Sequence, residues 1–203
     1  MIKAILFDLD GVLVDATEWH YEALNKALLL FGFKITRSEH LSVYNGLPTA
    51  EKLKLMSAKS SLPIGLHEII KSMKKKYTDE QVTLNCFPDY EKQIMLKQLK
   101  NKGYKLACCS NAQRYSVLNM LQRAQLDVFF DLIVGNDEGH KPKPAPDIYL
   151  HAFKELKVKP EQTYIVEDAP HGVKAAIDSG AHVLAVKGYS DVNLSLFIQS
   201  GIV

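Results

Sequence analysis

The segment Ile5-Leu6-Phe7-Asp8-Leu9-Asp10-Gly11 stands near the start of the 203-residue chain. Three apolar residues are followed at once by acidic residues and a glycine, which predicts a short buried strand that runs into a tight loop. Asp8 and Asp10 are separated by one residue, so an extended backbone directs both carboxylates to the same side. The segment therefore predicts a strand with two acidic side chains at its carboxyl end.

Four later apolar runs repeat this pattern, each ending in polar residues or glycine. They lie at residues 105–109, 132–134, 164–166 and 182–186. Helical patterns separate them, and one of these begins after a capping Asp89 and ends at Gly103. Strands alternating with helices predict an α/β fold, a doubly wound Rossmann-like parallel sheet with helices on both faces. The side chains expected to face the core include Ile94, Met95 and Leu99 in the first of these helices and Val173, Ala176 and Ile177 in the last.

Residues 15–80 show helical patterns and no strand run. Asp15 followed by Glu18 is typical of a capping box at a helix start, and Gly32 would end that helix. We therefore expect a small helical cap domain at 15–80, inserted after the first strand of an α/β core formed by 1–14 and 81–203. An insert at this point is expected to lie over the strand ends, where it would shield a reaction from water.

Composition limits the classes of partner. Lys and Arg number 25 against 23 Asp and Glu, and a net charge of +2 predicts neither nucleic acid nor an anionic membrane as partner. No signal-peptide pattern and no run of about 18 apolar residues occurs. Cys86, Cys108 and Cys109 lack metal-ligand spacing and read as reduced thiols, so we expect a cytoplasmic protein. The sequence does not indicate an oligomeric state.

Polar residues follow the predicted strands at the sheet edge where ligands of such folds bind. Close carboxylates such as Asp8 and Asp10 need a cation between them, and carboxylate and phosphate oxygens are the ligands that Mg²⁺ prefers. One carboxylate can then attack phosphorus while the other protonates the leaving oxygen. The other candidates at this edge, or in the loop that follows residues 132–134, are Ser110 and the Asn111 backbone N–H as donors to phosphate, Glu167 and Asp168 as metal ligands, and Lys141 or Lys143 as the positive charge.

Four segments match, in order, the motifs of one family. They are residues 8–15, 109–111, 143–147, and 166–168 with Gly172. Over nearly its whole length the chain resembles the haloacid dehalogenase superfamily of hydrolases. The resemblance favours Lys143 over Lys141 as the charged residue, because Pro-Ala-Pro-Asp-Ile-Tyr follows it.

The resemblance also implies a role for each site residue. Mg²⁺ would bind Asp8, the main-chain carbonyl of Asp10, and Asp168, with Glu167 as a further candidate. The implied roles in catalysis and substrate binding are Asp8 as nucleophile, Asp10 as general acid and base, Lys143 as charge clamp, and Ser110 with Asn111 as phosphate-binding residues.

Two further features indicate the type of reaction. Dehalogenases carry a different residue two places after the nucleophile, so Asp10 indicates phosphate ester chemistry. The insert resembles the cap of the phosphoglycolate phosphatase and β-phosphoglucomutase branch, but residues 46–49 read Gly-Leu-Pro-Thr where the mutase has Gly-x-Ser-Arg to bind a distal phosphate. We therefore predict a Mg²⁺-dependent phosphomonoester hydrolase that acts on a small phosphorylated metabolite through an aspartyl phosphate. The alternatives are a sugar phosphate mutase and a catalytically silent binding module.

Overall fold

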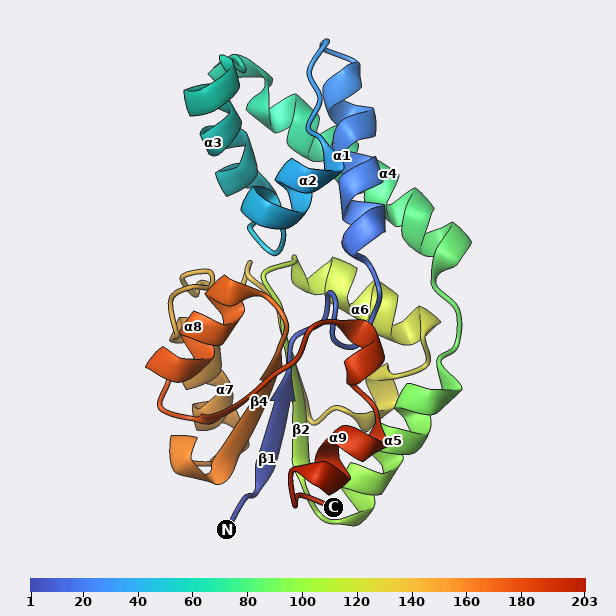
Figure 1. Ribbon diagram of the computed structural model, residues 1–203, viewed down its shortest axis with the longest axis vertical. Helices are drawn as coiled ribbons and strands as arrows, with labels where there is room; N and C mark the ends of the chain where they lie inside the picture. The colour runs from blue at the N-terminus through green and yellow to red at the C-terminus, as the bar shows by residue number, and fades with distance from the viewer. The chain divides into compact units, whose positions relative to one another are not determined.

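The computed structural model describes residues 1–203, and the chain divides into two compact units. One unit comprises Met1–Asp15 and Phe87–Val203, and the other comprises Ala16–Cys86. The first unit contains the sheet, whereas the second consists of helices and connecting loops (Figure 1). The helical unit thus follows the first strand in the chain, and it extends past residue 80 because its last helix continues to Asn85.

The sheet of the first unit has five strands, all paired in parallel. Their order across the sheet is β3-β2-β1-β4-β5, so the first strand lies at the centre. This confirms the predicted doubly wound α/β sheet. Phe7 at the end of β1 is in register with Cys108 on one side and Val166 on the other. The strands are β1 (Ala4–Phe7), β2 (Lys105–Cys109), β3 (Leu132–Val134), β4 (Thr163–Glu167) and β5 (His182–Ala185).

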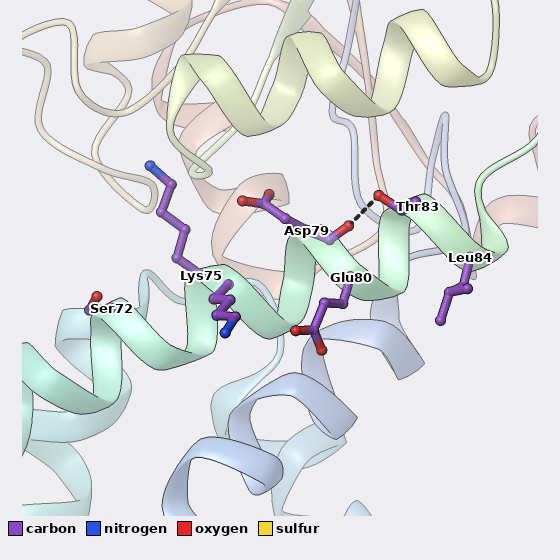
Figure 2. A pocket seen from close by; sticks show the side chains of 7 residues that line it. Ser72, Lys75, Asp79, Glu80, Thr83 and Leu84 are labelled. Carbon is purple, nitrogen blue, oxygen red and sulfur yellow. Dashed lines mark hydrogen bonds between the residues drawn. The ribbon is translucent and has the colours of Figure 1, made fainter.

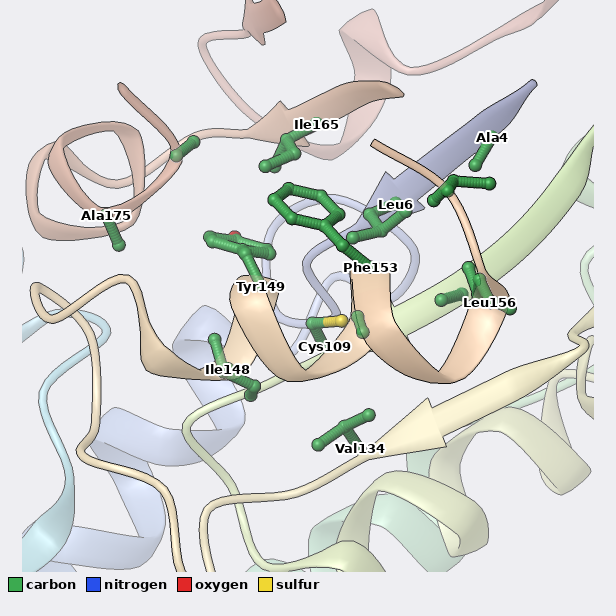
Figure 3. Close-up of a cluster of buried hydrophobic side chains, with 14 residues drawn as sticks. Ala4, Leu6, Cys109, Val134, Ile148, Tyr149, Phe153, Leu156, Ile165 and Ala175 are labelled. Atoms are coloured by element: carbon green, nitrogen blue, oxygen red, sulfur yellow. The ribbon is translucent and has the colours of Figure 1, made fainter. Parts of the chain in front are cut away.

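Helices cover both faces of this sheet (Figure 1). They are α5 (Tyr90–Asn101), α6 (Arg114–Arg123), α7 (Asp147–Leu156), α8 (Pro170–Asp178) and α9 (Leu194–Gln199), with 3₁₀ turns at Asp127–Phe129, Pro160–Gln162 and Tyr189–Asp191. On one face α7 and α8 pack against the strands around Leu6 and Ile165 (Figure 3). On the other face the ring of Phe7 lies 6.0 Å from that of Phe197 in α9. Each face of β1 is therefore buried against apolar side chains.

The helix faces differ in part from those predicted. Asp89 caps α5 as expected, accepting a hydrogen bond from the Lys92 N–H at 2.9 Å. Ile94 and Ile177, however, were wrongly assigned to the core, since they are 58% and 61% exposed. Met95, Leu96 and Leu99 face the core from α5, and Gly172, Ala175 and Ala176 from α8. The buried side of α8 is thus formed by small residues, and the larger Ile177 lies outside it.

The helical unit is built around a cluster of buried apolar side chains that includes Leu24, Tyr44 and Met56. The predicted capping box at Asp15 is wrong, because Ala16 is the N-cap of α1 and makes no side-chain hydrogen bond there. Glu18 instead pairs with Arg37 at 3.0 Å. The elements are α1 (Thr17–Leu29), α2 (Arg37–Glu39), a π-helical turn (His40–Tyr44), α3 (Thr49–Ser60), a 3₁₀ turn (Ile64–Leu66) and α4 (His67–Asn85). None of the helices in either unit combines the length and apolar character needed to cross a bilayer.

Candidate active site

The carboxyl ends of the three central strands place the acidic residues together. Asp8 follows β1, Ser110 follows β2, and Glu167 ends β4 with Asp168 directly after it. The Asp8 N–H donates to the carbonyl of Val166 at 3.0 Å, which continues the ladder between β1 and β4 past the end of β1. Asp8 is therefore held beside the end of β4 by backbone pairing.

Asp8, Glu167 and Asp168 form an acidic cluster in which one carboxylate oxygen of each lies within 4.8 Å of the others. Two of its oxygens, Glu167 Oε2 and Asp168 Oδ1, are buried and have no hydrogen-bond partner. A buried carboxylate oxygen without a donor is costly unless a cation approaches it. Carboxylate oxygens at this spacing fit a hard divalent cation, and Mg²⁺ is one that binds such ligands together with phosphate.

The pKa values in the cluster reflect its crowded negative charge. Burial, and then the charge of Asp8, raise the pKa of both Glu167 and Asp168 to about 7. The pKa of Asp8 is also raised, with burial as the largest cause; Lys143 opposes this rise, and Asp10 adds to it. A bound cation would favour the ionised form of each carboxyl group.

Lys143 is the cation that the structure places in this cluster. Its side chain is 2% exposed, and Nζ donates to Asp8 Oδ1 at 2.8 Å, to the Cys109 carbonyl at 2.8 Å and to Glu167 Oε1 at 2.5 Å. An ammonium group has three N–H donors, so all three are engaged. Burial opposes the charge, but the two carboxylates outweigh burial and raise the pKa of Lys143 well above its ordinary value. Lys141, the alternative considered from sequence, is exposed.

The two residues after β2 differ in what they contact. The Asn111 side chain holds the backbone of Lys143 on both sides: Oδ1 accepts from the Lys143 N–H at 2.9 Å, and Nδ2 donates to the Lys143 carbonyl at 3.2 Å. Ser110 is buried, and its Oγ accepts from the Ala112 N–H at 3.1 Å. That bond uses an oxygen lone pair, so the Ser110 hydroxyl hydrogen can still be donated to a ligand.

The loop after β1 carries Asp10 and closes on itself. The Gly11 N–H donates to the Val14 carbonyl at 2.8 Å, and the Val14 N–H donates to the Leu9 carbonyl at 2.9 Å. Gly11 has a φ of +81°, and a Cβ at this position would overlap the Asp168 carboxylate. Glycine is therefore required here for both conformation and space. The loop keeps Asp10 close enough for its charge to act on Asp8.

Two residues near Glu167 have contacts that sequence reasoning did not find. The Tyr149 hydroxyl, at the start of α7, donates to Glu167 Oε1. Gly172 lies so close to the Glu167 carboxylate that any Cβ there would overlap it. Gly172 belongs to the fourth motif and Tyr149 lies two residues after the third, so both could have been singled out, but neither motif indicates which atoms they contact.

A hollow is present along α4 of the helical unit (Figure 2). Its lining residues all come from α4, and its Thr83 hydroxyl donates to the Asp79 carbonyl of the same helix at 2.8 Å. The hollow is lined by Ser72, Lys75, Lys76, Asp79, Glu80, Thr83 and Leu84. It contains none of the residues of the acidic cluster.

Comparison with known proteins identifies the family. The model of the haloacid dehalogenase-like hydrolases matches residues 5–186. The chain belongs to this family. It is therefore an enzyme of the haloacid dehalogenase-like hydrolase type, as the order of its four motifs predicted.

Two curated members of the family are similar in sequence and are named as phosphatases. The phosphorylated carbohydrates phosphatase of Thermotoga maritima is 30% identical over 184 residues, which cover 88% of this chain and 82% of that protein. The phosphoglycolate phosphatase of Aquifex aeolicus is 31% identical over 194 residues, which cover 95% of this chain and 88% of that protein. The chain thus spans most of the length of both.

Solved structures share the fold. β-Phosphoglucomutase from Clostridium difficile superposes with a TM-score of 0.83 at 23% identity, covering 100% of this chain and 97% of that one. CbbY from Rhodobacter sphaeroides, solved in complex with phosphate, gives a TM-score of 0.80 at 25% identity, covering 93% of this chain and 88% of that one. These similarities support the α/β sheet and the helical unit described above.

Proposed function

We propose that this haloacid dehalogenase-like hydrolase is a Mg²⁺-dependent phosphatase that acts on a small phosphorylated metabolite, with Asp8 as its nucleophile. The observation that carries the proposal is the buried cluster in which Asp8 is bonded to Lys143 while Glu167 Oε2 and Asp168 Oδ1 have no donor. Such a site combines a nucleophile, a fixed positive charge and oxygen atoms ready for a cation. The phosphatase names of its curated relatives support the same reaction class.

In the first step, an oxygen of the ionised Asp8 carboxylate attacks phosphorus, and the bond from phosphorus to the ester oxygen breaks. Lys143 favours the ionised form of Asp8 through its bond to Oδ1. Asp10, in its protonated form, gives a proton to the leaving alcohol. The result is an acyl phosphate on Asp8 and a free alcohol.

In the second step, water attacks the phosphorus of the acyl phosphate. Asp10, now ionised, takes a proton from that water, and the bond from phosphorus to Asp8 breaks. Inorganic phosphate leaves, and both carboxyl groups return to their starting forms. The overall reaction converts a phosphomonoester and water into an alcohol and phosphate.

The metal-binding residues in this proposal are Asp8, the main-chain carbonyl of Asp10, and Asp168, with Glu167 completing the acidic cluster. When bound, Mg²⁺ would neutralise negative charge on the carboxylates and on the phosphoryl oxygens. The Ser110 hydroxyl hydrogen and the Asn111 backbone N–H are the donors that we assign to those oxygens. Lys143 acts through its charge and by orienting Asp8, because its three N–H groups are already bonded within the protein.

The partner that we propose is a small phosphorylated molecule and not nucleic acid, because the chain has a net charge of only +2. A cytoplasmic location is part of the same proposal. The three cysteines, Cys86, Cys108 and Cys109, are free and buried, which suits a reducing compartment.

A sugar phosphate mutase is the second candidate. The observation that favours it is the similarity to the crystal structure of a putative β-phosphoglucomutase from Thermotoga maritima, with a TM-score of 0.70 at 28% identity over 100% of this chain and 93% of that one. Residues 46–49, Gly-Leu-Pro-Thr, contain no arginine to bind a second phosphate. We therefore place hydrolysis first.

The test is phosphate release from a panel of sugar phosphates, phosphoglycolate and nucleotides, in Mg²⁺ or in EDTA. Wild type is expected to release phosphate only in Mg²⁺, and Asp8→Asn is expected to release none while keeping the circular dichroism spectrum of wild type. Asp178→Asn is the matched control, because Asp178 is exposed and pairs with Lys174 at the surface. Activity in a pure Asp8→Asn sample contradicts the mechanism, and silence of wild type on every ester directs the next assay to isomerisation of β-glucose 1-phosphate.

A further inference from the structure

Tyr149 joins the apolar core of the sheet to the acidic cluster. Its side chain is 0% exposed and lies among the apolar residues between α7 and the strands (Figure 3). Its ring is packed in this core cluster with Leu6, Cys109 and Phe153. The hydroxyl leaves the cluster and donates to Glu167 Oε1. A buried hydroxyl needs a hydrogen-bond partner, and here the partner is a residue of the acidic cluster.

The two oxygens of Glu167 are in different surroundings. Oε1 accepts from Lys143 Nζ at 2.5 Å and from the Tyr149 hydroxyl, whereas Oε2 is buried and accepts from no group. Gly172 leaves the space that the carboxylate occupies on its α8 side. The Glu167 carboxylate is thus held through Oε1, and Oε2 is left to accept a ligand.

We propose that Tyr149 is a positioning residue that fixes the Glu167 carboxylate so that Oε2 faces the metal position. This inference rests on the proposed Mg²⁺ site. The last torsion of a glutamate side chain is broad, and a single donor leaves the carboxylate free to turn about that bond. A second donor on a ring that is locked in the core removes this freedom. Hydrogen bonds of this kind to ligand carboxylates typically change metal affinity by about 10- to 100-fold.

Lys143 alone does not fix the carboxylate in this way. Its ammonium group donates to Asp8, to Glu167 and to the Cys109 carbonyl, so the position of Nζ is set by three acceptors and not by Glu167 alone. Tyr149 has one hydroxyl hydrogen, which goes to Glu167. The Lys143 Nζ also lies 5.0 Å from the centre of the Tyr149 ring, a contact that a phenylalanine ring would keep. Tyr149→Phe therefore removes the hydrogen bond to Glu167 and little else.

The experiment is calorimetric titration of the metal-free full chain with Mg²⁺, compared with the rise in melting temperature that Mg²⁺ produces. Tyr149→Phe is expected to weaken Mg²⁺ binding about tenfold or more. Tyr104→Phe is the matched control, because the Tyr104 hydroxyl donates to the Ile202 carbonyl at 2.7 Å in the same unit but away from the acidic cluster. The control is expected to lose a hydrogen bond without a change in the Mg²⁺ dissociation constant.

A second comparison tests whether Tyr149 acts through Glu167. In a Glu167→Gln background, Tyr149→Phe is expected to change the Mg²⁺ dissociation constant less than twofold, and a tenfold change there overturns the proposal. If Tyr149→Phe does not fold, 3-fluorotyrosine at position 149 decides the question, because it keeps the ring and strengthens the donor. Tighter Mg²⁺ binding than wild type supports the proposal, and unchanged or weaker binding overturns it.

The proposed function and this inference fail in different ways. A wild-type chain that binds no Mg²⁺ overturns the metal site itself. Wild-type binding that Tyr149→Phe leaves unchanged overturns only the role of Tyr149.

Discussion

Replacing Lys143 by methionine removes the positive charge from the acidic cluster while keeping a side chain of similar length. Lys143 Nζ makes two charge-assisted bonds, to Asp8 and Glu167, and one bond to a carbonyl, and its side chain is 2% exposed. Removal of one partner from a buried ion pair costs about 3–5 kcal/mol, since the remaining charges stay buried. We expect Lys143→Met to lose stability in this range near pH 8 in EDTA, and to show no phosphatase activity in Mg²⁺.

The size of this loss depends on pH, and its sign follows from the carboxyl groups. Glu167 and Asp168 already have pKa values raised to about 7, with burial as the largest cause, and loss of Lys143 raises them further. The folded variant then binds more protons than the unfolded chain at neutral pH, so its stability falls as pH rises. The loss is therefore expected to be smaller at pH 5, where the acids are neutral, than at pH 8.

Urea unfolding followed by circular dichroism measures this difference at the two pH values. Lys141→Met is the matched control, because Lys141 lies two positions away and is exposed. It is expected to change stability by less than about 0.5 kcal/mol. A loss below 1 kcal/mol for Lys143→Met at pH 8, or an equal loss for both variants, would refute the reasoning from buried charge.

Two further predictions concern other positions. Gly172→Ala places a methyl group where the Glu167 carboxylate lies, so it is expected to reduce both Mg²⁺ binding and phosphate release at least tenfold. The control is Gly65→Ala, whose Cβ meets open space and which is expected to leave both quantities unchanged. A Gly172→Ala enzyme with full activity would show that the carboxylate can move aside. Burial lowers the pKa of His40 to about 4, so the folded chain binds fewer protons at this residue than the unfolded chain between about pH 6.5 and pH 4. Stability is expected to fall as pH drops through that window and to fall less in His40→Gln, as measured by thermal unfolding across the pH range; identical pH profiles would count against a buried neutral imidazole.

The sequence was sufficient to predict the sheet and to group Asp8, Ser110, Glu167 and Asp168. Short apolar runs followed by polar residues indicate strand ends, and parallel strands bring those ends to one edge. The choice of Lys143 over Lys141 depended on family resemblance, because both follow the same local pattern. Such predictions rest on residues that are close in the chain or on the general geometry of parallel sheets.

Contacts that depend on the rotation of a helix were not predictable. Tyr149 reaches Glu167 only because α7 turns that position toward the strands, and an apolar face that includes Tyr149 reads simply as core. Ile94 and Ile177 were misplaced for a related reason, since a short helix with many apolar residues allows more than one buried face. The capping box at Asp15 failed because α1 begins after Ala16 and because Glu18 pairs with Arg37, 19 residues away, which a local pattern does not reveal.

The central place of β1 in the sheet bears on how the enzyme is made in the cell. Ala4 is in register with Lys105 on one side and with Thr163 on the other, so both neighbours of β1 come from much later in the chain. A ribosome releases the N-terminal part first, at about 5–20 residues per second. Asp8 therefore leaves the ribosome early but has no partner strand on its β4 side until Thr163–Glu167 has been translated. A nascent chain that ends before residue 168 contains Asp8 and still lacks the acidic cluster.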